Sequence, residues 1–332
     1  QVTATLIKPG PTATPMTAGI SGKGKLASPE QVAHDIVQGT NCLIQRDENN
    51  QIAQVCYDTV VHLSIEPYNE LTGEGILRHV IGRIGESGWM VILVTTSESL
   101  PNADKWVAAI REQLPQVTSI VQNINPKKTN VILGPKNILL YGDEYIRDSI
   151  KDISFNLSPH SFFQVNPEQT TVLYNQALTY ADLQGDETVI DAYCGTGTIS
   201  LFLAHKAKHV IGIEIVEPAI LDARENAKRN GFTNTEFIVA DAAVEMPKLY
   251  KNGVRPDIIV FDPIRAGCKE EVLTSAVAME PKKIVYVSCN PATMARDIAI
   301  LVDNGYELQE VQPVDMFPMT SHVECVALIT RK

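Results

Sequence analysis

The sequence predicts an α/β protein, with a doubly wound, mostly parallel sheet in its C-terminal part and a smaller mixed α/β domain before it. From about residue 155 onward, short apolar runs alternate with helical patterns, as they do in βαβ units. Before that point, two probable strands are followed by a helix and then by another strand, which is a mixed order. The length of 332 residues also suits about two domains.

The N-terminal half is expected to contain two regions. Residues 1–30 are rich in Gly, Pro, Thr and Ser without a steady period, so we expect a loop-rich segment there. Residues 31–154 form the mixed α/β domain, whose strands should pair in an antiparallel or mixed manner. Its expected elements are strands at 75–84, 89–96 and 117–124 and a helix at 102–114.

The second domain, residues 155–332, should contain five strands that each end in a polar or special residue. These strands are expected at 188–194, 209–215, 235–242, 257–263 and 283–289. Ligands of doubly wound sheets bind outside the carboxyl ends of the strands. We therefore expect one rim to gather Asp191, Cys194, Glu214, Asp241, Asp262 and Cys289.

Composition and charge exclude several classes of protein. The net charge of −11 argues against a broad nucleic-acid surface, which would be basic. The six cysteines form no C-x-x-C pair and show no zinc-ligand spacing, so we expect no metal site and no disulfide framework, and a cytoplasmic location. The longest apolar stretch, 89–94, is too short to span a membrane. The chain lacks an initiator Met and a signal core, and we expect it to be a fragment.

The first strand of the second domain leads into "DAYCGTGTIS", residues 191–200. Gly195 and Gly197 allow the backbone to approach a ligand before a helix begins. Glu214 follows about 20 residues later, where an acidic residue typically accepts hydrogen bonds from ribose hydroxyls. The third glycine of a dinucleotide-binding loop is absent, which favours S-adenosylmethionine as the cofactor. The alternative is a purely structural turn.

Cys289 stands at the end of an apolar strand, directly before Asn290 and Pro291. Asn is a common helix cap and Pro suits the first helical position, so a helix should begin here. A helix N-terminus lowers the pKa of a thiol, and we therefore expect Cys289 to be a nucleophile. The alternative is a packing role, because free cysteines are often buried. Cys194 and Cys268 are rival thiols, in the cofactor loop and in "AGCKE".

Five motifs together resemble a known family. They are "DAYCGTGT", "GIEIVEPAI", "VFDPIRAG", "VSCNPATMARD" and the terminal "DMFPMTSHVECVAL", with "SPHSFFQVN" at 158–166 before them. Their order is similar to that of the RNA uracil-5-methyltransferases, over roughly residues 60–332. The resemblance implies a Rossmann-like S-adenosylmethionine-dependent methyltransferase fold and methylation of C5 of a uridine in RNA. It favours 23S ribosomal RNA, with uridine 54 of transfer RNA as the alternative, and makes the 31–154 domain a candidate RNA contact.

The resemblance also implies roles for individual residues. Cys289 would add to C6 of the uracil, and Glu324 would later remove the C5 proton, with a pKa raised by its apolar neighbours. As an alternative, Glu324 is only the outward residue of an edge strand. The implied cofactor-binding residues are Gln164, Tyr193, Thr198, Glu214, Asp241 and Asp262.

Two residues would face the RNA. Phe162 would stack on the target base, unless it belongs to the core. Arg265 would position the nucleotide or brace its own loop. Ile264 replaces the Pro common at its position in the family, which reduces the rigidity of the loop.

Two other classes of function compete with this interpretation. A cytosine-5 methyltransferase would also use a cysteine, but usually carries a Pro-Cys dipeptide where this chain has "DPIRAG". A noncatalytic RNA-binding module could retain the fold, although the presence of both Cys289 and Glu324 argues against it. Titration with S-adenosylmethionine, followed by methyl transfer to transcripts, would distinguish such a module from an enzyme.

Overall fold

The computed structural model describes residues 2–3, 46–69, 72–129, 131–161 and 166–332. The chain divides into two compact units. The first unit comprises Gln1–Asp148 and Asn156–Val165, and the second comprises Ser149–Phe155 and Asn166–Lys332. The chain therefore passes between the units more than once, whereas the sequence predicted a single boundary between residues 154 and 155.

The first unit contains a mixed five-stranded sheet in the order β1-β2-β3-β4-β5. The pairs β1–β2, β2–β3 and β4–β5 are antiparallel, and β3–β4 is parallel, so the prediction of mixed pairing is confirmed. The strands are β1 (Val2–Thr3), β2 (Leu77–Gly85), β3 (Gly88–Thr95), β4 (Val117–Ile124) and β5 (Lys136–Gly142). Strand β1 lies within the segment that the sequence predicted to be loop-rich.

Two helices pack on this sheet and close its core. They are α2 (Asp47–His62), which the sequence analysis did not predict, and α3 (Ala103–Gln113). Both helices contribute to one apolar cluster with the sheet, for example through Ile52 and Trp106, which are fully buried. A separate two-stranded sheet, β6 (Ile146–Ile150) and β7 (Ile153–Leu157), follows in the chain.

The second unit contains a seven-stranded sheet in the order β10-β9-β8-β11-β12-β14-β13. The first five strands of this order are parallel, so the prediction of a doubly wound, mostly parallel sheet is confirmed. They are short runs that are largely buried in β8, β9, β11 and β12, as parallel strands usually are, whereas the edge strand β10 is only partly buried. Their bounds are β8 (Thr188–Asp191), β9 (His209–Glu214), β10 (Thr235–Val239), β11 (Ile258–Phe261) and β12 (Lys283–Ser288).

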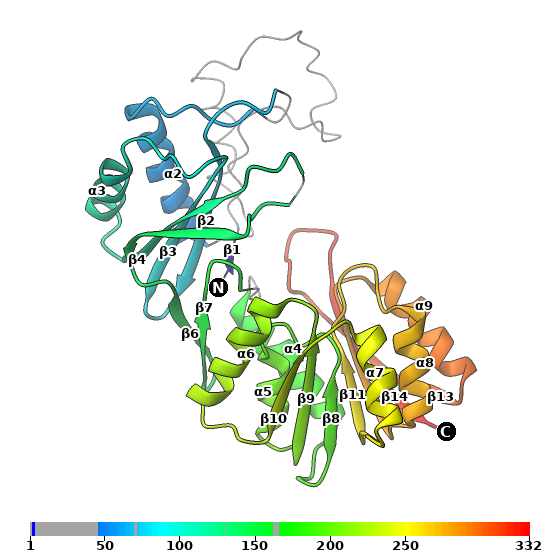
Figure 1. Ribbon diagram of the computed structural model, residues 1–332. Coiled ribbons are helices and arrows are strands. Elements are labelled where there is room, and N and C mark those ends of the chain that lie inside the picture. The colour runs from blue at the N-terminus through cyan, green and yellow to red at the C-terminus, as the bar shows by residue number, and fades with distance from the viewer. Residues whose placement is uncertain (1, 4–45, 70–71, 130, 162–165) are drawn as a thin grey trace. The chain divides into compact units, whose positions relative to one another are not determined.

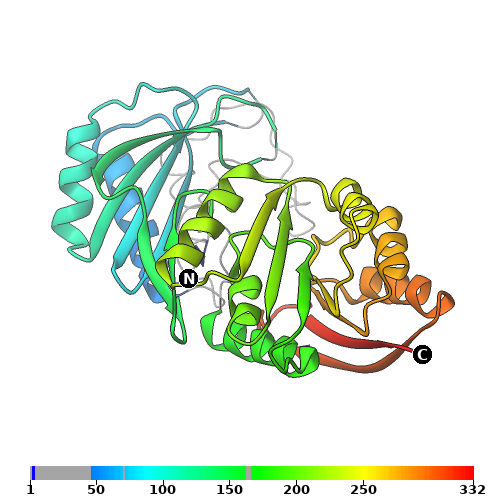
Figure 2. The ribbon, with the colours of Figure 1, turned by 60° about the horizontal axis from the view of Figure 1, so that its bottom comes forward.

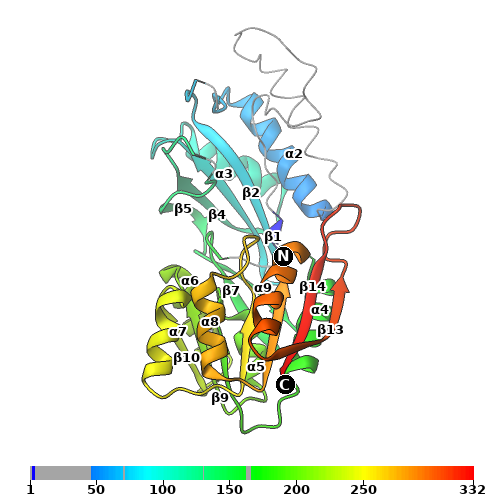
Figure 3. The same ribbon diagram turned by 90° about the vertical axis from the view of Figure 1, so that its right-hand side faces the viewer.

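Helices cover both faces of this sheet (Figure 1). The chain steps from β8 outward to β10 and then returns to β11, and since such crossovers are right-handed, the helices before and after this reversal lie on opposite faces. On one side α4 packs against α5, and on the other α7, α8 and α9 stand in a row (Figure 3). The helices are α4 (Pro167–Ala181), α5 (Thr198–Ala204), α6 (Glu217–Arg229), α7 (Ala242–Lys251), α8 (Glu270–Met279) and α9 (Pro291–Asp303).

The last two strands, β13 (Tyr306–Val314) and β14 (Glu324–Arg331), run side by side in opposite directions (Figure 2). Strand β14 inserts between β12 and β13 and is antiparallel to both. Its amino end therefore lies at the same edge as the carboxyl ends of the parallel strands. In the part of the chain that the structure describes, no helix is long and apolar enough to cross a membrane.

Candidate active site

The carboxyl edge of the large sheet gathers the polar residues that the sequence predicted to meet there. Asp191 ends β8 and Glu214 ends β9, while Asp262 and Cys289 directly follow β11 and β12. Asp241 lies two residues beyond β10. Because these strands are parallel and adjacent, the prediction of a common rim is confirmed.

Glu324 joins this rim from the opposite direction along the sheet. Ser288 of β12 pairs with Cys325 of β14. Cys289 follows the first member of this pair and Glu324 precedes the second. Because the two strands are antiparallel, Cys289 and Glu324 therefore lie opposite each other, one position beyond the Ser288–Cys325 pair.

Cys289 leads directly into α9. The side chain of Asn290 caps this helix by accepting a hydrogen bond from the Ala292 amide at 3.2 Å, and Pro291 is the first helical residue, as predicted. Cys289 is half-buried, whereas every other cysteine of the described chain is buried. Of these described thiols it is the one most open to a ligand.

The pKa of Cys289 differs from the expectation. We expected the start of the helix to lower it, but burial and the neighbouring Glu324 and Asp262 carboxylates raise it above its usual value, while Arg265 opposes this rise. The expectation was wrong because it considered only the helix, and these carboxylates come from strands distant in sequence. The rival Cys268 is more strongly affected, since burial raises its pKa to about 12.

Glu324 is a buried carboxylate, with only 4% of its surface exposed. Burial raises its pKa from 4.5 to about 7, and Arg265 partly opposes this shift. The raised pKa agrees with the expectation from its apolar neighbours. The alternative of an outward residue on an edge strand is wrong, because β14 lies inside the sheet and the side chain is buried.

Further ionisable groups surround this pair. Asp262 has a pKa well above its usual value because of burial and the nearby Glu324 and Asp191 carboxylates. Arg265 lies close enough to act electrostatically on both Cys289 and Glu324, and it lowers the pKa of each. Tyr174 of α4 is buried, and its pKa is raised by burial and then by Asp262, Asp191 and Glu324. One thiol, one guanidinium and several carboxyl groups therefore share this end of the sheet.

The loop after β8 turns into α5 through two glycines with positive φ angles. Gly197 has φ +81° and caps α5, and a Cβ atom there would lie 3.1 Å from Ala223 and Phe237. Gly195 has φ +53° and open space around a Cβ position. Behind the loop, Ser200 donates a 2.6 Å hydrogen bond to the buried carboxylate of Asp191.

The structure describes four of the predicted cofactor residues beside Asp262. Tyr193 and Thr198 lie in the loop and at the start of α5, and Thr198 is buried. Glu214 accepts a 2.9 Å hydrogen bond from the Val216 amide through Oε1. Asp241 accepts from the Ala243 amide at 2.9 Å and forms a 2.5 Å ion pair with Lys269, which lowers its pKa.

These residues suit a nucleoside that carries positive charge. The Oδ1 atom of Asp191 is buried and has no hydrogen-bond partner among the described residues, so it is a free acceptor beside the loop. Glu214 stands where a ribose acceptor is expected. The nearby carboxylates complement a sulfonium and an ammonium group. The donor and acceptor set therefore fits S-adenosylmethionine.

Two predicted residues, Gln164 and Phe162, lie outside the described residues. Conversely, the sequence analysis missed Tyr174 and Lys269. Tyr174 lies within an amphipathic helix, where an aromatic residue reads as core, and no local signal distinguishes it. Lys269 follows "AGC" directly, but its partner Asp241 is remote in sequence, so only the fold brings the two together.

Comparison with known proteins identifies the family. The sequence model described as tRNA (uracil-5-)-methyltransferase matches residues 103–332. The chain belongs to the RNA uracil-5-methyltransferase family. It is 52% identical over 305 residues to an uncharacterized RNA methyltransferase of Halalkalibacterium halodurans, covering 91% of this chain and 67% of that protein. An uncharacterized RNA methyltransferase of Listeria innocua is 50% identical over 315 residues, covering 94% and 69%. The chain thus spans about two thirds of the length of these relatives.

A solved structure of another RNA uracil-5-methyltransferase has a similar fold to this chain. The tRNA (uracil-54, C5)-methyltransferase of Pyrococcus abyssi, in complex with S-adenosyl-L-homocysteine, superposes with a TM-score of 0.69 at 30% identity, covering 85% of this chain and 67% of that one. The prediction of a Rossmann-like S-adenosylmethionine-dependent methyltransferase fold is confirmed. The predicted cofactor agrees with the cofactor product in that complex.

Proposed function

We propose that this protein transfers a methyl group from S-adenosylmethionine to C5 of a uridine in RNA. The observation that carries the proposal is the β12–β14 register, which places Cys289 and Glu324 at facing positions on the ligand-binding edge of the sheet. Asp262 and Arg265 act electrostatically on the same thiol. A thiol and a base of raised pKa at one edge suit a reaction that needs a nucleophile first and a proton acceptor later.

The chemistry begins at Cys289. Its thiolate adds to C6 of the uracil, the new C6–S bond displaces the C5=C6 π electrons towards the C4 carbonyl, and C5 becomes an enolate carbon. When bound, S-adenosylmethionine would supply an electrophilic methyl group, whose bond to sulfur would break as C5 bonds to the methyl carbon, with S-adenosylhomocysteine as the leaving group. The proton on C5 then passes to Glu324, its electrons restore the C5=C6 double bond, and the C6–S bond breaks to return the thiolate.

The pKa of Glu324, about 7, suits this role. A general base works best when its pKa lies near the working pH, since it is then partly ionised and still basic enough to take a proton. Arg265 is exposed next to the thiol and offers a cationic partner to the thiolate and to the developing enolate. We assign Phe162 to stacking on the flipped base and Gln164 to the cofactor, as the family resemblance implies.

Ribosomal RNA, specifically 23S, is the substrate favoured by the sequence, and we retain it in this proposal together with a cytoplasmic location. Uridine 54 of transfer RNA is the second candidate, because the solved relative at 30% identity is a tRNA (uracil-54, C5)-methyltransferase. Mapping 5-methyluridine in 23S and transfer RNA from a deletion strain decides between them. Loss from 23S alone supports the first substrate, and loss from position 54 alone supports the second.

The nucleophile is tested by Cys289→Ala. We expect methylation of RNA to vanish and the affinity for S-adenosylmethionine, measured by titration calorimetry, to stay within about twofold, since the charged hydrogen bonds that dominate such binding come from other residues. Cys325→Ala is the matched control, because this neighbouring thiol is buried in the core, and it should retain activity. Residual methylation above a few per cent in Cys289→Ala would exclude Cys289 as the nucleophile.

A further inference from the structure

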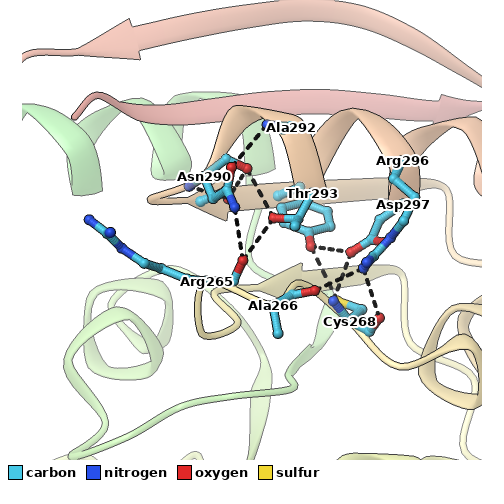
Figure 4. Close-up of polar contacts among 10 residues, drawn as sticks. Arg265, Ala266, Cys268, Asn290, Ala292, Thr293, Arg296 and Asp297 are labelled. Carbon is cyan, nitrogen blue, oxygen red and sulfur yellow. Dashed lines mark hydrogen bonds and ion pairs between the residues drawn. The ribbon is translucent and has the colours of Figure 1, made fainter. Parts of the chain in front are cut away.

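The segment from Asp262 to Cys268 is hydrogen bonded through its main chain to side chains of α9 (Figure 4). The carbonyl of Arg265 accepts from Asn290 at 3.0 Å and from Thr293 at 3.2 Å. One turn further along α9, Arg296 donates to the carbonyl of Ala266 at 3.0 Å. The first turns of α9 therefore fix the path of this segment, while the guanidinium of Arg265 extends away from the helix (Figure 4).

Asp297 of α9 lies at the centre of these contacts and is fully buried. Its Oδ2 atom accepts from the Cys268 amide at 2.7 Å and from the Tyr286 hydroxyl at 2.6 Å. Its Oδ1 atom accepts from Arg296 Nε at 2.8 Å. A buried carboxylate is tolerated only when it is paired and hydrogen bonded, so these partners have little freedom to move. We call Asp297, Arg296, Tyr286 and Cys268 the Asp297 cluster.

The cluster extends to the cofactor loop. The Cys268 thiol donates to the Tyr286 hydroxyl at 3.5 Å, and the Tyr286 hydroxyl in turn donates to Asp297. Tyr193, in the loop after β8, acts electrostatically with Cys268, which contributes to the raised pKa of Tyr193. Because burial raises the pKa of Cys268 to about 12, it remains a thiol with a proton to donate. The hydrogen bonds therefore form a chain from Cys268 through Tyr286 to Asp297 of α9, and Tyr193 of the cofactor loop lies beside its Cys268 end.

We propose that Asp297 is a positioning residue for methyl transfer, which acts by fixing the 262–268 segment so that Arg265 stands beside Cys289 and Glu324. This inference rests on the proposed function. Asp297 is not catalytic, since its partners are the main chain of the segment, Tyr286 and Arg296, and none of these reacts. Its effect passes through Arg265, which opposes the rise in the pKa of Cys289 caused by burial and by the carboxylates.

Gly267 is an independent sign of how tightly the cluster is packed. It has φ +80°, and a Cβ atom there would lie 2.6 Å from both the Asp297 carboxylate and the Arg296 guanidinium. Gly253 has a similar φ of +84° with no atom within 4 Å of a Cβ position. Alanine at either position strains the backbone comparably, but only Gly267→Ala also displaces the cluster. The two glycines therefore form a matched pair.

The reactivity of Cys289 tests the proposal without RNA. Alkylation of Cys289 by iodoacetamide is followed against pH by mass spectrometry of its peptide, in wild-type, Asp297→Asn, Gly267→Ala and Arg265→Ala chains. We expect both cluster variants to shift the profile to higher pH, as Arg265→Ala does, so that alkylation near neutral pH slows by about threefold to tenfold, which corresponds to half to one pKa unit. Asp303→Asn, at the exposed end of α9, and Gly253→Ala should leave the profile unchanged.

A double variant distinguishes positioning from general loosening of the structure. If Asp297 acts through Arg265, Asp297→Asn in an Arg265→Ala background should change the profile no further. Additive shifts, or an unchanged profile in folded Asp297→Asn and Gly267→Ala chains, would overturn the proposal. Should Asp297→Asn fail to fold by circular dichroism, Gly267→Ala against Gly253→Ala gives the answer.

Two separate assays distinguish a failure of this proposal from a failure of the proposed function. Wild-type methylation of 23S and transfer RNA transcripts tests the function, whereas alkylation tests the cluster on the free protein. Absence of methylation together with the expected alkylation shifts would reject the function and retain the link from Asp297 to Cys289. Methylation by the wild type, with no alkylation shift in Asp297→Asn, would support the function and reject the link from Asp297 to Cys289.

Discussion

At the scale of residues, the protonation states of Cys289 and Glu324 are coupled, because a negative charge on either group disfavours a negative charge on the other. The Glu324 carboxylate contributes to the raised pKa of the Cys289 thiol. Arg265 has the opposite effect and lowers the pKa of both groups. When Glu324 is protonated, the thiolate of Cys289 is therefore easier to form. In the proposed reaction the roles reverse after methyl transfer, because Glu324 would then have to be ionised to accept the C5 proton. The arrangement suits a reaction in which the nucleophile acts before the base.

The raised pKa of Glu324 also predicts how stability depends on pH. Its pKa is 4.5 in the absence of burial and about 7 in the folded chain. Between pH 4.5 and about 7, the folded state therefore retains a proton on Glu324 that the unfolded state has lost. Stability contributed by the protonated form is present below pH 4.5 and is lost as pH rises to about 7. Glu324→Gln should remove this loss and stabilise the chain at about pH 8 by up to roughly 3 kcal/mol.

Urea unfolding at about pH 4 and about pH 8 checks this prediction, with equal stabilities expected at the lower pH. Glu307→Gln, exposed on the neighbouring strand β13, is the control and should follow the wild type at both pH values. Equal stability of Glu324→Gln and wild type at the higher pH would show that burial does not raise the pKa of the Glu324 carboxyl.

At the scale of elements, the start of α4 illustrates how one cap supports the site. Asn166 accepts a hydrogen bond from the Gln169 amide at 3.2 Å, and α4 carries Tyr174 to the buried carboxylates. Asn166→Ala should cost about 1 kcal/mol and lower the melting temperature by roughly 2–4 °C. Differential scanning calorimetry measures it, with Val172→Ala on the exposed face of α4 as control. A melting temperature no lower than that of the control would contradict the capping role.

The predictable elements are those whose pattern is local. The five parallel strands were found because each is a short apolar run with a polar residue at its carboxyl end, although the structure ends all five of them one to three residues earlier. Strand β13 was missed because its side chains are exposed between Tyr306 and Val314, which leaves no apolar period. Helix α2 was missed because its first turn, "DENN", reads as loop.

The candidate site shows the same division between local and distant causes. Motifs placed Cys289 and its helix cap correctly because both lie in one stretch of sequence. The direction of the thiol pKa was wrong because Glu324 and Asp262 reach it from other strands. The facing positions of Cys289 and Glu324 depend on the insertion of β14 between β12 and β13, and no local pattern reveals a strand order.

At the scale of the whole molecule, the charge of the chain limits how it can hold RNA. The net charge of −11 on this chain provides no general attraction for phosphates, so we expect its recognition of RNA to rely on local contacts and on the shape of an unstacked uridine. The covalent bond from Cys289 to the base would then keep the substrate in place during methyl transfer. A variant that cannot release this bond should accumulate it.

The central claim is therefore tested by Glu324→Gln, incubated with methyl-labelled S-adenosylmethionine and with unmodified 23S or transfer RNA transcripts. We predict that Cys289 still adds to the base and that the methyl group is still transferred, while loss of the C5 proton stalls. A slowly migrating, labelled protein–RNA band should appear on a denaturing gel with the preferred transcript, and it should be absent from the Cys289→Ala/Glu324→Gln double variant. Turnover of Glu324→Gln at the wild-type rate without this band would contradict the account.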